Sequence, residues 1–229
     1  MFEVRNLKSG YGQSVVIDDL SFTVGDNETV AVLGRNGMGK TTLFKTIMGV
    51  LPGMGGSIKL KSDELNGRES YRRVKAGLGY VPQGRHVFPT LTVEENIKTG
   101  LHVRGESEVP GEIYSLFPVL LEMRKRKAGN LSGGQQQQLV IARALATDPK
   151  VVLLDEPTEG IQPSIIKEIA RKINEIKMVQ KISFIVTEQV LSFALDVADR
   201  IIVMEKGRIA LEAPRSEINE ATLSKYLSV

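Results

Sequence analysis

The sequence predicts an α/β protein with a mostly parallel β-sheet and an inserted helical lobe, and three observations support this fold class. The apolar run Thr29–Leu33 reads as a strand that ends at a glycine-rich turn. The run Val151–Leu154 is entirely apolar, as is typical of a strand that is buried on both faces of a parallel sheet. A helical stripe follows it, formed by Ile165, Ile169, Ile173 and Ile176.

The N-terminal elements are expected to be strands followed by one helix. Within Val15–Val24, apolar and polar residues partly alternate, which favours a half-buried strand. After the glycine-rich turn, a helix should begin near Lys40, because apolar residues recur on one helical face at Leu43, Phe44, Ile47 and Met48. The turn therefore joins the carboxyl end of a strand to the amino end of a helix.

The middle of the chain changes character and predicts helices. Thr92–Glu95 has the pattern of a helix capping box, Pro110 is suited to open a second helix, and Gln135–Ala146 has helical character. We interpret residues 84–146 as a helical lobe that is inserted into the α/β core.

The core pattern returns after this lobe. Further strands are expected near Ser183–Thr187 and Ile201–Glu205, and one short amphipathic helix is expected in the tail, Ser216–Val229. A chain of 229 residues is long enough for one compact domain with a small appended lobe. We therefore expect a single domain over residues 1–229, with its core at about 1–83 and 147–229 and the lobe at about 84–146.

The composition is that of an ordinary globular protein, with 41% hydrophobic and 25% charged residues. No apolar run approaches the roughly 18 residues needed to cross a bilayer, and the first residues lack the apolar core of a signal peptide, so a cytoplasmic protein is expected. The absence of cysteine excludes disulfides, thiol nucleophiles and thiolate metal sites. Two histidines, His86 and His102, are too few for a typical zinc site.

The net charge of +3 and a sequence pI near 9.0 permit an acidic partner. The densest basic run is Arg124–Lys127, and no aromatic residue interleaves with it as a base-stacking platform would require. We interpret this run as a solvated surface and expect no nucleic-acid partner.

Residues 34–41 carry the chemistry of phosphate binding, because they match G-x-x-x-x-G-K-[ST] at every position between a strand and a helix. The glycines let backbone N–H groups point at phosphates, and the helix start adds a partial positive charge. Lys40 would reach the β- and γ-phosphates of ATP, Thr41 would bind Mg²⁺, and Thr42 would reach the α-phosphate region. A turn that merely joined strand and helix would need neither the lysine nor the hydroxyl. The predicted loop comprises Gly34, Arg35, Asn36, Gly37, Met38, Gly39, Lys40, Thr41 and Thr42.

Two carboxylates follow the apolar strand Val151–Leu154. Asp155 is expected to bind Mg²⁺ through water, and Glu156 to polarise the attacking water. Adjacent residues of a strand point to opposite sides, so the two carboxylates can serve different partners. Any strand can end in acidic residues, but after a complete phosphate loop we interpret this pair as functional.

The run Leu131–Gln135, LSGGQ, is the signature of ATP-binding cassette (ABC) proteins, and the chain resembles that family along its whole length. The resemblance implies a phosphate-loop ATPase core, an antiparallel β subdomain and the helical lobe. It also implies a head-to-tail dimer, in which ATP lies between one subunit's phosphate loop and the other's signature loop. Ser132 and Gly134 would donate hydrogen bonds to the γ-phosphate across the interface, within the nucleotide-binding set Ser132, Gly133, Gly134 and Gln135.

Further motifs carry over by the same resemblance. Tyr11 matches the aromatic residue that stacks on adenine, and Gln83 matches the glutamine that touches Mg²⁺ and the attacking water. The segment Gly84–Leu91 would face the membrane partner. Two positions depart from the family: Gln189 stands at the usual switch histidine, and Gln162 stands where aspartate is usual. Gln189 can hydrogen-bond the γ-phosphate but cannot carry a charge, so catalysis should rely on Glu156.

The sequence of the segment Asp155–Ser164, with Gly84 and Arg85 after Gln83, resembles that of the branched-chain amino-acid and urea importer group. Within this group it resembles the urea-type second ATPase subunit. That resemblance implies two integral-membrane permeases, a second and different ABC ATPase subunit, and an extracytoplasmic substrate-binding protein. It places the chain on the inner face of the cell membrane.

Three alternatives remain open beside the urea importer. The first is a branched-chain amino-acid importer, which differs in cargo alone. The second is a soluble ABC ATPase of translation or DNA repair, although those types usually carry two cassettes or a long coiled coil. The third is a small-molecule kinase, which leaves LSGGQ unexplained.

Overall fold

The computed structural model describes residues 1–227, which form two β-sheets. The larger sheet has the order β10-β9-β3-β8-β7-β6, and its neighbouring strands are parallel except for β10 and β9. The smaller sheet is antiparallel, with the order β2-β1-β4-β5. The predicted α/β class, with its mostly parallel sheet and antiparallel subdomain, is confirmed. The strands are β1 Phe2–Tyr11, β2 Ser14–Val24, β3 Thr29–Leu33, β4 Gly53–Leu60, β5 Asp63–Glu64, β6 Leu78–Val81, β7 Val151–Asp155, β8 Ser183–Glu188, β9 Arg200–Glu205 and β10 Arg208–Pro214.

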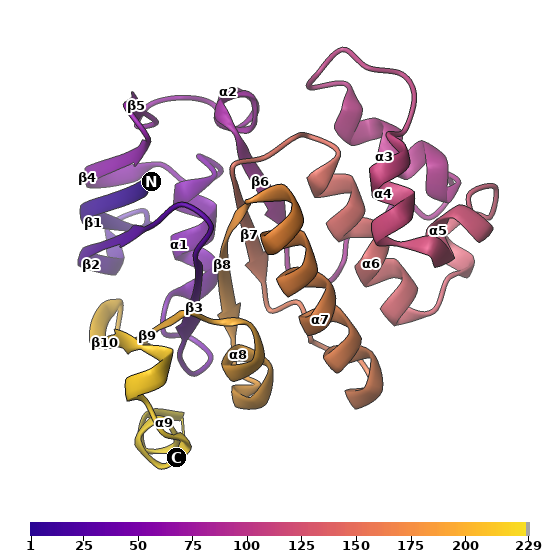
Figure 1. The fold of residues 1–229 in the computed structure, drawn as a ribbon. Helices are drawn as coiled ribbons and strands as arrows, with labels where there is room; N and C mark the ends of the chain where they lie inside the picture. Colours follow the sequence, from indigo (N-terminus) through magenta and orange to yellow (C-terminus); the bar gives the residue numbers. More distant parts are fainter. Residues whose placement is uncertain (228–229) are drawn as a thin grey trace.

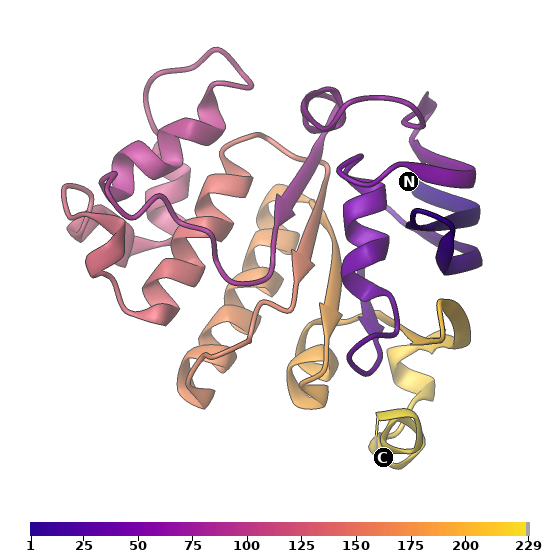
Figure 2. The same ribbon diagram turned by 180° about the vertical axis from the view of Figure 1, so that it is seen from behind.

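Helices surround the larger sheet, as Figures 1 and 2 show from opposite sides. They are α1 Lys40–Ile47, α2 Ser70–Ala76, α3 Val93–Leu101, α4 Gly111–Leu116, α5 Pro118–Glu122, α6 Gly133–Leu145, α7 Pro163–Gln180, α8 Leu191–Val197 and α9 Glu220–Leu227, with short 3₁₀ turns at Ala128–Asn130 and Arg215–Glu217. Helices α3 to α6 stand together beyond β6, at one end of the sheet (Figure 1). No helix within residues 1–227 combines the length and the apolar character needed to cross a membrane.

Helix α1 lies between the two sheets, where it contacts β1 on one side and β7 on the other (Figure 1). Its predicted apolar face is buried, through Leu43, Phe44, Ile47 and the following Met48. Burial of this face fixes the start of α1, and with it the glycine-rich turn, against the carboxyl end of β3.

Strand β7 is buried on both faces, as its composition predicts. Val151 and Leu153 pack with the cluster around α1, whereas Val152 and Leu154 pack with the cluster that includes α6 and α7. This alternation follows from the period of two along a strand. The two layers hold β7 in the centre of the molecule and deliver Asp155 and Glu156 to one edge of the sheet.

Two capping boxes define helix starts. Thr92 Oγ1 accepts from the Glu95 backbone N–H at 3.2 Å, and the Glu95 carboxylate accepts from the Thr92 N–H at 2.7 Å, as predicted. Ser132 and Gln135 form the same arrangement at α6. Helix α6 therefore begins at Gly133, two residues before the predicted start, so the glycines of the signature lie in its first turn.

Other boundaries differ slightly from the predictions. Pro110 is the N-cap of α4, so the helix itself begins one residue later, at Gly111. The tail helix begins at Glu220 rather than near Ser216, because Arg215–Glu217 forms a 3₁₀ turn. The end of the predicted tail helix, residues 228–229, lies outside the described residues.

Candidate active site

The phosphate loop runs from the end of β3 to the start of α1. Gly39, the residue before α1, has a φ angle of +103°, and a Cβ atom there would lie 2.8 Å from Ile17 Cδ1. The left-handed conformation favours glycine, and a Cβ atom there would also force the Ile17 side chain of β2 to shift. The loop borders a cavity of about 260 Å³, whose lining is Val16, Asn36, Gly37, Gly39, Lys40, Thr41, Thr42, Gln83 and Glu156.

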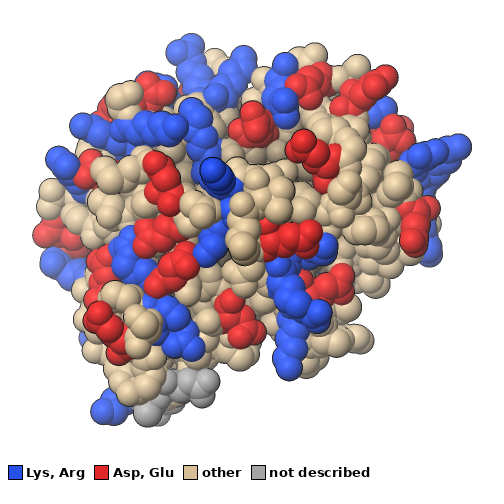
Figure 3. All heavy atoms as spheres, viewed as in Figure 1, with Lys and Arg blue, Asp and Glu red and all other residues tan. Residues whose placement is uncertain are grey.

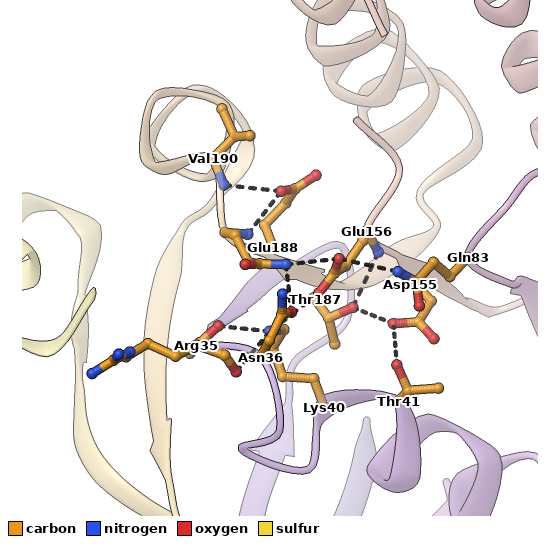
Figure 4. A network of polar contacts seen from close by, with 12 residues as sticks. Arg35, Asn36, Lys40, Thr41, Gln83, Asp155, Glu156, Thr187, Glu188 and Val190 are labelled. Carbon is orange, nitrogen blue, oxygen red and sulfur yellow. Dashed lines mark hydrogen bonds and ion pairs between the residues drawn. The ribbon is translucent and has the colours of Figure 1, made fainter. Parts of the chain in front are cut away.

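Lys40 is buried at the base of this cavity, with 4% of its side chain exposed. Its Nζ donates to the carbonyl oxygens of Gly34 at 2.6 Å and Arg35 at 3.2 Å, and lies 3.1 Å from Glu156 Oε1 (Figure 4). A buried ammonium group needs such partners, because water does not solvate it. The loop thus holds a desolvated positive charge at the site where a polyphosphate would enter.

Asp155 is 1% exposed and is held by hydroxyl groups. Its Oδ1 accepts from Thr187 Oγ1 at 2.6 Å and from Thr41 Oγ1 at 3.4 Å, and its Oδ2 accepts from the Tyr80 hydroxyl at 3.4 Å. Burial raises the pKa of Asp155, the hydroxyl hydrogen bonds oppose that rise, and the charge of nearby Glu156 adds to it. Burial likewise raises the pKa of Tyr80.

The oxygens of Thr41 and Asp155 form a donor pair that could hold a hard divalent cation. Residues 1–227 contain no cluster of three or more histidine, cysteine or acidic side chains suited to a metal. A cation at Thr41 and Asp155 would therefore complete its coordination with water or phosphate oxygens.

Glu156 has a φ angle of +46°, in the left-handed region that costs a non-glycine residue roughly 1–2 kcal/mol. The chain turns sharply there, so the side chains of Asp155 and Glu156 contact different partners, whereas the Glu156 backbone N–H donates to Thr187 Oγ1, the hydroxyl that donates to Asp155. Glu156 Oε2 accepts from Gln189 Nε2 at 2.9 Å and from Gln83 Nε2 at 3.4 Å. Gln189 Nε2 also donates to Asn36 Oδ1 at 2.8 Å, which joins the glutamine to the phosphate loop.

Most predicted residues of the loop, together with Gln83, Asp155, Glu156 and Gln189, thus meet at one edge of the larger sheet. Tyr11 and the signature residues do not. Tyr11 ends β1 with 50% of its surface exposed and does not line the cavity. Ser132–Gln135 begin α6, in the helical part of the chain, and likewise do not line it.

The sequence reasoning missed Thr187, Tyr80 and Glu188. Strands β7 and β8 are parallel, and Asp155 is paired with Thr187 in their register. Because carboxyl ends of neighbouring parallel strands meet at one edge, polar residues at the end of the predicted Ser183–Thr187 strand were the available signal.

Comparison with known proteins agrees with this geometry. A family profile described as "ABC transporter" matches residues 17–159. The high-affinity branched-chain amino acid transport ATP-binding protein BraG of Pseudomonas aeruginosa is 37% identical over 214 residues, which covers 92% of this chain and 91% of that protein. The probable branched-chain amino acid transport ATP-binding protein LivF of Archaeoglobus fulgidus is 34% identical over 223 residues, which covers 96% of this chain and 94% of that protein.

Among solved structures, a nucleotide-free ATP-binding cassette from an ABC transporter aligns with a TM-score of 0.84 at 27% identity. The alignment covers 100% of this chain and 95% of that one. The chain therefore belongs to the ABC transporter family, of which it is an ATP-binding and ATP-hydrolysing domain.

Proposed function

We propose that this chain hydrolyses Mg²⁺-ATP to power an importer of the branched-chain amino-acid and urea group. The observation that carries the catalytic part is the buried contact of 3.1 Å between Lys40 Nζ and Glu156 Oε1. It brings a phosphate-binding cation and a candidate base together at the edge of one polar cavity.

The residues of the cavity have distinct roles in this proposal. Lys40 binds the β- and γ-phosphates, and Thr41 and Asp155 hold Mg²⁺, which neutralises phosphate charge when it is bound. Glu156 accepts a proton from the attacking water. Gln83 and Gln189 keep the Glu156 carboxylate oriented, since both donate to its Oε2 atom.

A second ATPase subunit would complete the site. Gly133 and Gly134 are the first residues of α6, and their N–H groups have no acceptor within the helix. Such a helix start favours an anion, yet it does not line this chain's own cavity. We infer that the signature residues act on ATP that is bound by the partner ATPase, in a head-to-tail dimer.

The permease partner would contact the groove between the helical lobe and the core. This groove has a volume of about 430 Å³ and a largely apolar lining, which includes Val50, Phe88 and Val103. Phe88 is exposed and belongs to the segment Gly84–Leu91 that follows Gln83. Tyr80, whose hydroxyl donates to Asp155, also lines the groove, so a permease segment there would lie next to a residue of the active site. This contact would keep the chain on the inner face of the membrane. Residues 84–146 would then act together as the lobe that binds the permease.

Charge does not favour nucleic acid as the alternative partner. Basic and acidic side chains are interspersed over the face shown in Figure 3, so that face does not present a continuous basic stripe. Membrane fractionation of cells tests this choice. Recovery with ribosomes or DNA instead of membranes would support a soluble ABC ATPase.

The cargo separates two versions of the importer. Support for a urea importer rests on the sequence of Asp155–Ser164, whereas the two relatives above are named for branched-chain amino acids. An ATPase subunit does not touch the cargo, so the site geometry favours neither. The decisive test is uptake of labelled urea and labelled leucine in cells with and without this gene under nitrogen limitation. Loss of urea uptake alone would support the urea importer, loss of leucine uptake alone the amino-acid importer, and no change in either would refute both.

A further inference from the structure

Glu188 is a buried carboxylate to which the roles above assign nothing. It is the last residue of β8 and is 2% exposed. Its Oε1 accepts from the Thr158 backbone N–H at 3.1 Å and from Thr158 Oγ1 at 2.6 Å. Its Oε2 accepts from the backbone N–H groups of Gln189 at 2.8 Å and Val190 at 3.0 Å (Figure 4). One carboxylate therefore joins two loops with four hydrogen bonds.

Both of these loops carry a residue of the active site. Thr158 lies two residues after Glu156, in the segment that leads from β7 to α7. Gln189 donates its side-chain amide to Glu156 Oε2 at 2.9 Å. The contacts thus close a ring, in which Glu188 fixes the backbone of Gln189 on one side and the segment after Glu156 on the other.

We propose that Glu188 is a positioning residue for ATP hydrolysis, which keeps the Gln189 amide on the Glu156 carboxylate by tying their two loops together. It acts through Gln189 and Thr158 and does not touch the reacting atoms. The inference rests on the ATPase activity of the family and does not depend on the cargo.

The chemistry of the four donors explains why a carboxylate is needed. Three of them are backbone N–H groups, which can only donate. A glutamine at position 188 would have nearly the same shape, but its NH₂ group would face N–H groups on one side and lose hydrogen bonds there. Gln189 is neutral and has several rotatable bonds, so its contact with Glu156 depends on a fixed backbone.

The test is a double-mutant cycle with Glu188→Gln and Thr158→Val, using the purified chain alone and together with the partner ATPase subunit. Nucleotide binding is measured by calorimetry, and turnover by phosphate release at saturating Mg²⁺-ATP. For each single variant we expect ATP affinity within about twofold of the wild type and a kcat that is lower by about tenfold or more. Because both variants cut the same link, the double variant should be no slower than the slower single variant.

A matched control separates positioning from loss of stability. Thr46, at the far end of α1, is 1% exposed, and its Oγ1 shares a buried hydrogen bond of 2.7 Å with Ser9 Oγ. Thr46→Val should lower the melting temperature with kcat within about twofold of the wild type. If Glu188→Gln does not fold, Thr158→Val carries the same comparison alone.

Three results would overturn the proposal. They are near-normal kcat in Thr158→Val, multiplied losses in the double variant, and a loss of kcat in Thr46→Val as large as that in Glu188→Gln. Wild-type turnover and its loss in Glu156→Gln are measured first. A wild-type chain that is inactive both alone and together with the partner ATPase subunit would count against the catalytic assignment itself, which keeps that failure distinct from a failure of the Glu188 inference.

Discussion

Replacing Glu156 by glutamine should separate ATP binding from ATP hydrolysis. The substitution keeps the shape of the side chain but removes the ability to accept a proton from water. Loss of a general base typically costs about 10²- to 10⁴-fold in rate. We expect kcat to fall by about a hundredfold or more, which corresponds to about 3 kcal/mol of activation free energy at roughly 1.4 kcal/mol per tenfold.

The geometry predicts a different result for binding. The carboxylate of Glu156 forms a buried ion pair with Lys40, which is 4% exposed against 9% for Glu156. Glutamine would remove this ion pair, while the carbonyl oxygens of Gly34 and Arg35 would still hold the ammonium group. Lys40 would then not have to break an ion pair before it binds the phosphates. The affinity of the variant for ATP should therefore be equal to or higher than that of the wild type.

The assay combines phosphate release at saturating Mg²⁺-ATP with calorimetry of ATP binding. Glu159→Gln is the matched control, because it neutralises an exposed carboxylate three residues further along the same loop. Turnover of Glu156→Gln close to that of the control would refute the role of Glu156 as the base. Lost ATP binding would refute the account of the ion pair.

The other predictions concern the loop, the signature helix and the buried aspartate. Lys40→Ala should weaken ATP binding by about a hundredfold or more in calorimetry, and undiminished affinity would contradict the phosphate-loop assignment. In Gly134→Ala the new Cβ would lie 2.6 Å from Ile165 Cγ2, so the melting temperature should fall, and Ile165→Ala should restore part of it. A melting temperature unchanged by Gly134→Ala would show that the contact is not tight. The raised pKa of Asp155 adds stability that is complete below about pH 4 and is lost as the pH rises through the folded-state pKa. Without metal, Asp155→Asn should therefore be more stable than the metal-free wild type at neutral pH. A melting temperature at neutral pH that is no higher than that of the wild type would contradict this.

The elements that the sequence predicted well are those with strong local patterns. Thr29–Leu33 and Val151–Leu154 were recognisable because a strand between two layers must be apolar at successive positions. Strand β10 was missed, because it lies at the edge of the sheet and its residues alternate only between half-buried and exposed positions. Such a strand is defined by its pairing with β9 and carries little hydrophobic signal of its own.

The site shows the same division between local and non-local information. The phosphate loop is contiguous, so a motif was sufficient to find its residues. The contacts of Asp155 with Thr187 and Tyr80 depend on the order β8-β7-β6, which joins segments far apart in the chain. The left-handed backbone of Glu156 was equally hidden, because nothing in the pattern of acidic residues distinguishes it from Asp155.

The charges of the buried site indicate why nucleotide and cation should bind together. Asp155 and Glu156 are both buried, Lys40 pairs with Glu156, and the charge of Glu156 contributes to the raised pKa of Asp155. A polyphosphate that drew Lys40 away would leave Glu156 without its counter-ion next to the buried Asp155, at a desolvated position where two unpaired carboxylates are costly. A divalent cation at Thr41 and Asp155 would remove that cost. In the proposed mechanism the cation therefore stabilises the protein's own carboxylates as well as the phosphates, and Glu156 becomes free to act as a base once Lys40 has turned to the nucleotide.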